Sequence, residues 1–175
     1  MNSAGAGEIF SHIPSFVWAI LAFIVIMGLL QSGDQWMSKS RLKLVPMIWL
    51  AYGVWGVVGS FGYSAGAVVP WVFGLLASQS LVRRSGWPGG CRFDSARGQF
   101  FVPGSWLPLT LMMGIFMAKF ALGMSSALQP ELLDSSAFAS SFSALFGAFG
   151  GAFLGRSRNI LNSNTPMIEG QFEAS

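Results

Sequence analysis

The sequence has few charged residues and few of the side chains that enzymes use. Only 10% of its 175 residues are Asp, Glu, Lys or Arg, whereas soluble domains carry about 25%. So few charges cannot cover a globular core with a solvated surface, which excludes an ordinary soluble domain. The sequence has one histidine and one cysteine, which excludes the usual zinc and haem ligand sets.

Catalytic and nucleotide-binding motifs are missing as well. The glycine-rich segment 86–90 lacks the Gly-Lys-Ser/Thr ending of a phosphate loop. No carboxylate lies clearly within the apolar segments, although proton-coupled transport usually depends on one. We therefore predict no catalytic residue, no metal and no cofactor, and we do not expect an enzyme.

What the sequence does contain is a set of five apolar segments. Each is roughly 18–19 residues long, close to the ~20 needed to cross the hydrocarbon core of a bilayer. Backbone polar groups in lipid must bond within their own segment, which favours helices. We predict an all-α, polytopic transmembrane helix bundle over residues 1–158, followed by a polar, disordered cytoplasmic tail over residues 159–175. The expected spans are 12–30, 44–61, 65–82, 106–124 and 137–154.

Two prolines lie near the expected starts of the second and third spans, at Pro46 and Pro70. A proline in the first turn of a helix loses no hydrogen bond, because the N–H at that position has no partner within the helix. We therefore expect both prolines in first turns.

Nine of the ten Lys and Arg residues lie in three short segments. These contain Lys39, Arg41 and Lys43; Arg83, Arg84, Arg92 and Arg97; and Arg156 and Arg158. The connections 62–64 and 125–136 contain no Lys or Arg. Under the positive-inside rule this alternation predicts an N-terminus outside and a C-terminus in the cytoplasm. In a bacterium we expect this multi-pass protein in the inner membrane.

The cations between the spans have an expected partner of their own. Because they flank apolar segments, their natural counter-charges are anionic lipid headgroups. We expect this contact from the cations of the first and second of these segments, residues 39–43 and 83–97, and we do not expect nucleic acid as a partner.

The segment 91–102 alternates polar and apolar residues around Asp94 and Gly98. This pattern predicts a short cytosolic β-hairpin. An isolated hairpin is marginally stable in water, so we expect it to lean on the bilayer surface or on the bundle. Cys91, at its start, is expected to be a free thiol.

Small residues recur every four positions along the expected fifth span. They are Ala139, Ser143, Gly147, Gly151 and Gly155. Such a stripe lets two helix backbones approach closely. It is either a face for oligomerisation or a partner subunit, or a groove filled by another helix of the same chain. Gly53, Gly56 and Gly59 of the second span are candidates for the second alternative.

Lys119 lies alone inside the fourth span. A charge within a transmembrane helix is costly and often functional. We place it past the midplane and about a turn from the outer end, where its stem could snorkel to the outer headgroups or make a structural hydrogen bond. The other interpretation is a binding or permeation role. Glu131 and Asp134 are the nearest plausible partners.

Several of these segments together resemble a known family. Pro103-Gly104-Ser105-Trp106-Leu107-Pro108-Leu109, then Lys119-Phe120-Ala121-Leu122-Gly123, then Gly155-Arg156, are similar to segments of a family of small bacterial inner-membrane proteins of unknown function. The resemblance covers mainly residues 97–158. It implies a membrane location and a helical fold but no activity, and it places Lys119 at the family's basic position.

Two functions follow from these observations. The first is a structural, assembly or accessory subunit that packs against itself or against another membrane protein. The second is a small oligomeric channel or transporter in which Lys119 favours an anionic solute.

Overall fold

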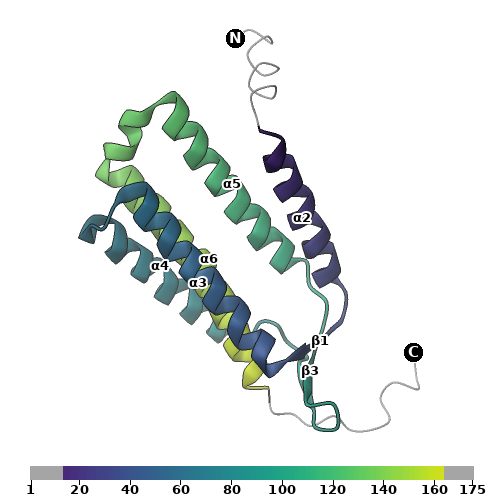
Figure 1. The fold of residues 1–175 in the computed structure, drawn as a ribbon. Helices are drawn as coiled ribbons and strands as arrows, with labels where there is room; N and C mark the ends of the chain where they lie inside the picture. The colour runs from purple at the N-terminus through teal and green to yellow at the C-terminus, as the bar shows by residue number, and fades with distance from the viewer. Residues whose placement is uncertain (1–13, 164–175) are drawn as a thin grey trace.

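The computed structural model describes residues 14–163 and confirms the five-span helix bundle (Figure 1). Its long helices are α2 (Ser15–Ser32), α3 (Lys39–Phe61), α4 (Ala65–Ser85), α5 (Leu107–Leu128) and α6 (Ser136–Leu161). All five are long and apolar enough to cross a membrane. The first two residues of the expected first span, and positions 164–175 of the expected tail, lie outside the described residues.

Several helices extend beyond the expected spans. Helix α3 begins at Lys39, so the basic residues expected in a loop form its first turns. The last helix α6 continues to Leu161, so the first residues assigned to the tail are helical. Pro46 and Pro70 consequently lie inside α3 and α4. The expectation that they occupy first turns was wrong: α3 starts at Lys39, before its apolar segment, and Pro70 is the sixth residue of α4, which starts at the expected Ala65.

An internal proline leaves one backbone carbonyl of its helix without the usual donor, since proline has no N–H. Pro46 leaves the carbonyl oxygen of Leu42 without its backbone N–H donor, and the hydroxyl of Ser157 on α6 donates to that oxygen instead. Pro70 likewise leaves the carbonyl oxygen of Gly66 without its backbone N–H donor, and the hydroxyl of Ser140 on α6 donates to it at 3.1 Å. Two serines of α6 thus complete the hydrogen bonding of the two helices beside it.

The small-residue stripe of α6 is occupied by α4. A Cβ atom on Gly147 would collide with the carbonyl of Trp71, and one on Gly151 would collide with the carbonyl of Leu75. In the other direction, a Cβ on Gly74 of α4 would collide with the backbone of α6. Another helix of the same chain therefore fills the groove, and that helix is α4 rather than the glycine-bearing α3.

The remaining stripe residues continue the same contact toward both ends of α6. Gly155 lies against Gln79 and Val82 of α4, with Cβ-to-atom distances near 3.0 Å. Ser143 is fully buried and its hydroxyl has no hydrogen-bond partner, whereas Ala139 is half-buried. The stripe thus serves close packing within the chain along most of α6.

The phenylalanines of α6 form a second face, against α3 and α5. Phe146 packs in a buried cluster with Ala118 and Leu122 of α5. Phe153 belongs to a second cluster on α5 and stacks on Trp49 of α3 with ring centroids 5.5 Å apart. These side chains attach α5 to the group formed by α3, α4 and α6.

Helix α2 pairs with α5, which lies far from it in the sequence (Figure 1). The two helices approach closely at Gly28, where a Cβ atom would meet the side chain of Leu109. Their neighbouring turns are joined by Asp34 Oδ1, which accepts a hydrogen bond from the Gly104 N–H at 2.8 Å. The bundle thus consists of an α2–α5 pair beside the α3–α4–α6 group.

A small antiparallel sheet covers one end of the bundle. Its strands are β1 (Gln35–Ser38), β2 (Arg92–Asp94) and β3 (Gln99–Val102), in the order β1-β3-β2. The expected hairpin is present as β2 and β3, and Asp94 Oδ1 accepts from the Ala96 N–H at 2.8 Å in its turn. The sequence did not predict strand β1.

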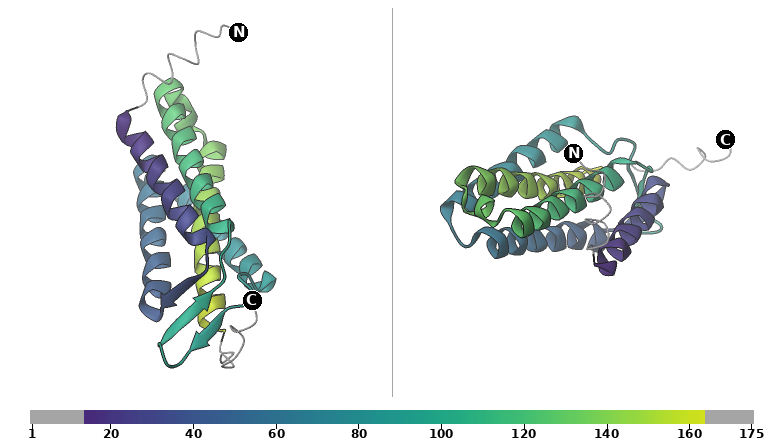
Figure 2. Two further views of the ribbon diagram at one scale, coloured as in Figure 1. Left: turned by 90° about the vertical axis from the view of Figure 1, so that its right-hand side faces the viewer. Right: turned by 90° about the horizontal axis from the view of Figure 1, so that it is seen from above.

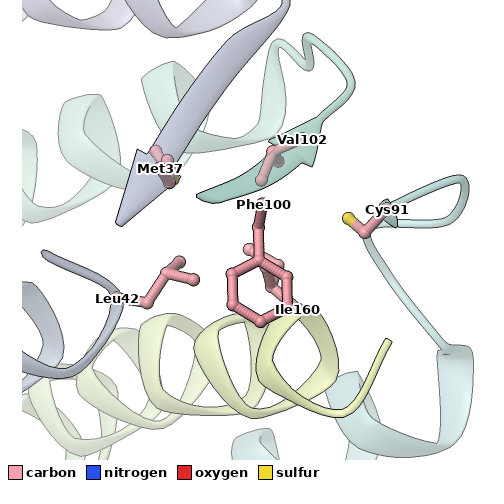
Figure 3. Close-up of a cluster of buried hydrophobic side chains, with 6 residues drawn as sticks. All are labelled: Met37, Leu42, Cys91, Phe100, Val102 and Ile160. Carbon is pink, nitrogen blue, oxygen red and sulfur yellow. The ribbon is translucent and has the colours of Figure 1, made fainter. Parts of the chain in front are cut away.

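The sheet rests on the bundle through a cluster of buried side chains (Figure 3). Phe100 and Val102 of β3 meet Leu42 of α3 and Ile160 of α6, with Met37 and Cys91 beside them. Of the two supports expected for the hairpin, the bundle is therefore the one observed.

Removing the Ser157 hydroxyl tests the role of α6 as a donor to its neighbours. We expect Ser157→Ala to lower the free energy of unfolding by about 1–3 kcal/mol, since the Leu42 carbonyl would stay buried without a donor. Ser143→Ala is the matched control. Its hydroxyl is equally buried but unpartnered, so its removal should be neutral or stabilising. Equilibrium unfolding in detergent, followed by circular dichroism, measures both.

A double-mutant cycle with Pro46 isolates the interaction. An alanine at position 46 restores the N–H that the Leu42 carbonyl lacks. Pro46→Ala should therefore be better tolerated in the Ser157→Ala protein than in the wild type. Strictly additive effects of the two substitutions would contradict the proposed exchange of donors.

Candidate functional site

A large apolar cleft lies between the α2–α5 pair and α3. It has a volume of about 990 Å³. Its walls include Phe16 and Phe23 of α2, Tyr52 of α3 and Phe120 of α5. Lys119 is the one charged side chain in its lining. The cleft is therefore an apolar space with a single cation on its wall.

Lys119 lies deeper in its helix than the expected span implied. Because α5 extends to Leu128, Lys119 is about 18 Å from Leu107 and about 14 Å from Leu128 at about 1.5 Å per residue. The expected span ended at Met124, which had placed Lys119 about one turn from the outer end. In the structure it lies near the middle of α5.

The Lys119 ammonium points into the bundle. Its Nζ atom lies 4.5 Å from the ring centroid of Phe146 on α6 and 5.6 Å from that of Tyr52 on α3. A Cβ atom added to Gly56 of α3 would collide with Nζ, so the ammonium contacts the α3 backbone where a side chain is absent. This orientation directs the charge toward aromatic faces rather than along α5 to its end.

The residues expected as ion-pair partners do not pair with Lys119. Glu131 and Asp134 lie in the short 3-10 helix η1 (Pro130–Asp134). Within residues 14–163 the ion pair found is that between Arg97 and Asp94. A second cavity of about 20 Å³ adjoins Lys119, which is room for about one water molecule. The charge thus has aromatic rings but no carboxylate around it in the described part of the chain.

The chemistry available at this site is attraction of a negative group. Residues 14–163 contain no cluster of His, Cys, Asp and Glu that could hold a metal ion. The cleft lining contains no His, Cys, Asp, Glu, Ser or Thr side chain, and its one hydroxyl group is that of Tyr52. The arrangement can hold an apolar body whose one anionic group reaches the ammonium. Sequence patterns do not distinguish the α2 and α3 residues of this cleft from residues that face lipid, because both are apolar.

The segments that carry the basic residues expected at lipid headgroups, which are the first turns of α3, the last turn of α4 and the β2–β3 hairpin, lie at the end of the bundle that carries the sheet (Figure 2). Lys39 lies over the Phe93 ring at 4.5 Å, and Arg97 lies over the Trp36 ring at 4.7 Å. Arg41 and Lys43 are exposed in the first turns of α3. The others are Arg83 and Arg84 in the last turn of α4 and Arg92 in β2.

Replacing Lys119 with methionine tests whether the cation holds the fold together. We expect the unfolding free energy in detergent to change by no more than about 1 kcal/mol, because desolvated cation–π contacts contribute about 2 kcal/mol and removing a charge from an apolar wall offsets most of their loss. Gly56→Ala is the companion variant, since its methyl would displace the ammonium into the cleft. A loss of several kcal/mol in Lys119→Met would assign the residue a structural role instead.

Comparison with known proteins places the chain in a family. Neither the curated proteins nor the solved structures give a match to it. A family model described as "Family of unknown function (DUF6622)" matches residues 6–167, which includes the cleft, Lys119 and the whole described fold. The chain belongs to this family of unknown function, DUF6622.

Proposed function

We propose that this membrane protein is an assembly or accessory subunit whose cleft receives a transmembrane helix of another membrane protein. The observation that supports this most directly is Lys119, a cation on the wall of an apolar cleft with no carboxylate partner in residues 14–163. Charges within membrane helices usually face a bundle interior or cavity and pair with an opposite charge. A partner helix bearing one Asp or Glu would supply that pair.

The charge distribution of the chain favours a different protein over a second copy of itself. The carboxylates in residues 14–163 are Asp34, Asp94, Glu131 and Asp134, and all lie outside the five long helices. A second copy therefore cannot offer a carboxylate from one of those helices. A different membrane protein can supply a carboxylate from one of its transmembrane helices.

The surfaces also favour the cleft over the α6 stripe as the docking site. The stripe is covered by α4. The cleft walls, in contrast, keep large apolar side chains exposed, with Phe16 and Phe23 of α2 at 61% and 62%. Docking a helix there would bury these side chains by close packing.

The alternative is a small oligomeric channel or transporter in which Lys119 attracts an anionic solute. The size of the cleft and the position of Lys119 on its wall favour it. The walls oppose it, because almost all lining residues are apolar and hydrophobic constrictions expel water. A helix is a better match to such walls than a hydrated anion.

Site-specific photocrosslinking in the native membrane tests the helix-docking proposal. A photoreactive residue at Phe23 or Phe120, on the cleft walls, should capture a defined membrane protein through a helix that contains Asp or Glu. The same probe at Leu81, which is 71% exposed on α4, is the matched control and should not. Lys119→Met should reduce capture by about tenfold, as expected for loss of one buried charge pair, and Lys119→Arg should retain most of it.

Two results would contradict helix docking. Equal crosslinking in the wild type and in Lys119→Met would show that the Lys119 charge does not contribute to docking. Anion flux in liposomes reconstituted with the pure protein, lost in Lys119→Met, would support the transport alternative instead.

We further propose a bacterial inner-membrane location with the N-terminus outside and the sheet in the cytoplasm, since the basic residues gather at that end. Tyr63→Cys in the α3–α4 turn should react with an impermeant maleimide in intact cells, and Ser95→Cys in the hairpin turn only after permeabilisation. Burial raises the pKa of the Cys91 thiol and Arg156 offsets only part of this, so at neutral pH wild-type Cys91 should stay protonated and unlabelled. Labelling of Ser95→Cys, but not of Tyr63→Cys, in intact cells would contradict the proposed orientation.

A further inference from the structure

Arg156 is a buried cation that sequence reasoning treated as one more topology-setting charge. It lies near the end of α6 with only 8% of its surface exposed. Its guanidinium lies 5.4 Å from the ring centroid of Trp87, and its Nε atom is buried without a hydrogen-bond partner. Most Arg side chains at a helix end reach into solvent, whereas this one is enclosed.

No carboxylate in residues 14–163 neutralises Arg156. Asp34 accepts from the Gly104 N–H, and Asp94 pairs with Arg97 in the hairpin turn. Glu131 and Asp134 lie in η1, which precedes α6 and is therefore at its opposite end. A second cation, Arg41, lies on the neighbouring helix α3 beside it, because Ser157, the residue after Arg156, donates to the carbonyl of Leu42, the residue after Arg41. The two arginines thus occupy adjoining positions on packed helices, and residues 14–163 place no carboxylate between them.

The backbone around Arg156 is held in place on both sides. Ser157 donates to the Leu42 carbonyl of α3. Asn159 Nδ2 donates to the carbonyls of Val82 at 2.9 Å and Trp87 at 2.8 Å, which joins α6 to the end of α4 and to the loop beyond it. These bonds keep Arg156 from swinging outward with its helix end. A buried charge held in this way costs several kcal/mol unless an opposite charge reaches it.

The adjacent thiol does not supply the missing charge. Cys91 is 7% exposed, and its Sγ donates to the carbonyl of Pro88 at 3.4 Å. A thiol in this setting is neutral, so it adds no negative charge beside the guanidinium. Residues 14–163 thus supply no counter-charge for the buried Arg156.

We propose that Arg156 and Arg41 together bind a phosphate group, with the guanidinium of Arg156 held against the Trp87 ring. Arginine is suited to this ligand because its planar fork donates two parallel hydrogen bonds to phosphate oxygens. The site lies at the basic end of the bundle, where lipid phosphates meet a spanning helix. The phosphate is that of an anionic lipid headgroup or of a free phosphorylated solute, which present the same group to the arginines.

Thermal unfolding of the full-length protein in neutral detergent measures this binding. Short-chain phosphatidylglycerol should raise the unfolding temperature of the wild type in a saturable manner. Arg156→Met and Arg41→Gln should each increase the half-saturating concentration by about tenfold or more, the effect of losing one charge-assisted pair. Arg158→Met is the matched control, because Arg158 is exposed on the same helix end, and it should bind like the wild type.

Further variants and ligands distinguish the two possible sources of the phosphate and control for a folding defect. Arg156→Lys keeps the charge but loses the fork, so it should fold and bind with intermediate affinity. Arg41 is exposed, so Arg41→Gln should fold normally. A saturable, Arg156-dependent effect of inorganic phosphate alone would assign the site to a free phosphorylated ligand, whereas a response to phosphatidylglycerol alone would assign it to lipid. If all arginine variants, Arg158→Met included, shift the titration equally, the proposal is overturned.

Discussion

The fold depends on hydrogen bonds that α6 donates to the backbones of its neighbours. In lipid every backbone polar group needs a partner within the protein, and an internal proline breaks that rule once per helix. Ser157 restores the partner of the Leu42 carbonyl in α3, and Ser140 restores that of the Gly66 carbonyl in α4. Between these two serines the glycines of α6 admit the α4 backbone. Helix α6 therefore donates the hydrogen bonds that the backbones of α3 and α4 lack, and it also packs closely against α4.

Local patterns in the sequence predicted the parts of this fold that depend on nearby residues. The five spans follow from runs of apolar residues, and the hairpin follows from Asp94 and Gly98 in a tight turn. The strand β1 was missed because its partner β3 lies more than sixty positions away and the four residues of β1 carry no turn signal. The helical start of α3 at Lys39 was missed because the lysines and arginines of its first turns look like a loop.

Other features could not be predicted because they depend on which helix is the neighbour. A proline in mid-helix is unfavourable by local rules, yet a serine from a distant helix completes the bonding at Leu42. A small-residue stripe indicates a close approach but not the helix that makes it, because the α4 atoms that meet it are backbone carbonyls, which every sequence provides. Lys119 was identifiable as an isolated charge in an apolar segment. Arg156 was not, since its burial depends on a contact with Trp87, which lies in the loop after α4.

The pairing of α2 with α5 has a consequence for biosynthesis. From Ser32 to Leu107 the ribosome adds about 75 residues, which takes roughly 4–15 s at about 5–20 residues per second. During that interval α2 exists without the helix that contacts it at Gly28, and strand β1 exists without β3. The α3–α4 turn is short and those two helices are made in succession, but α6, which satisfies both of their prolines, is made last. Among the described helices, the contacts of α2 with α5 can therefore form only after α5 is made, and those of α3 and α4 with α6 only after α6 is made.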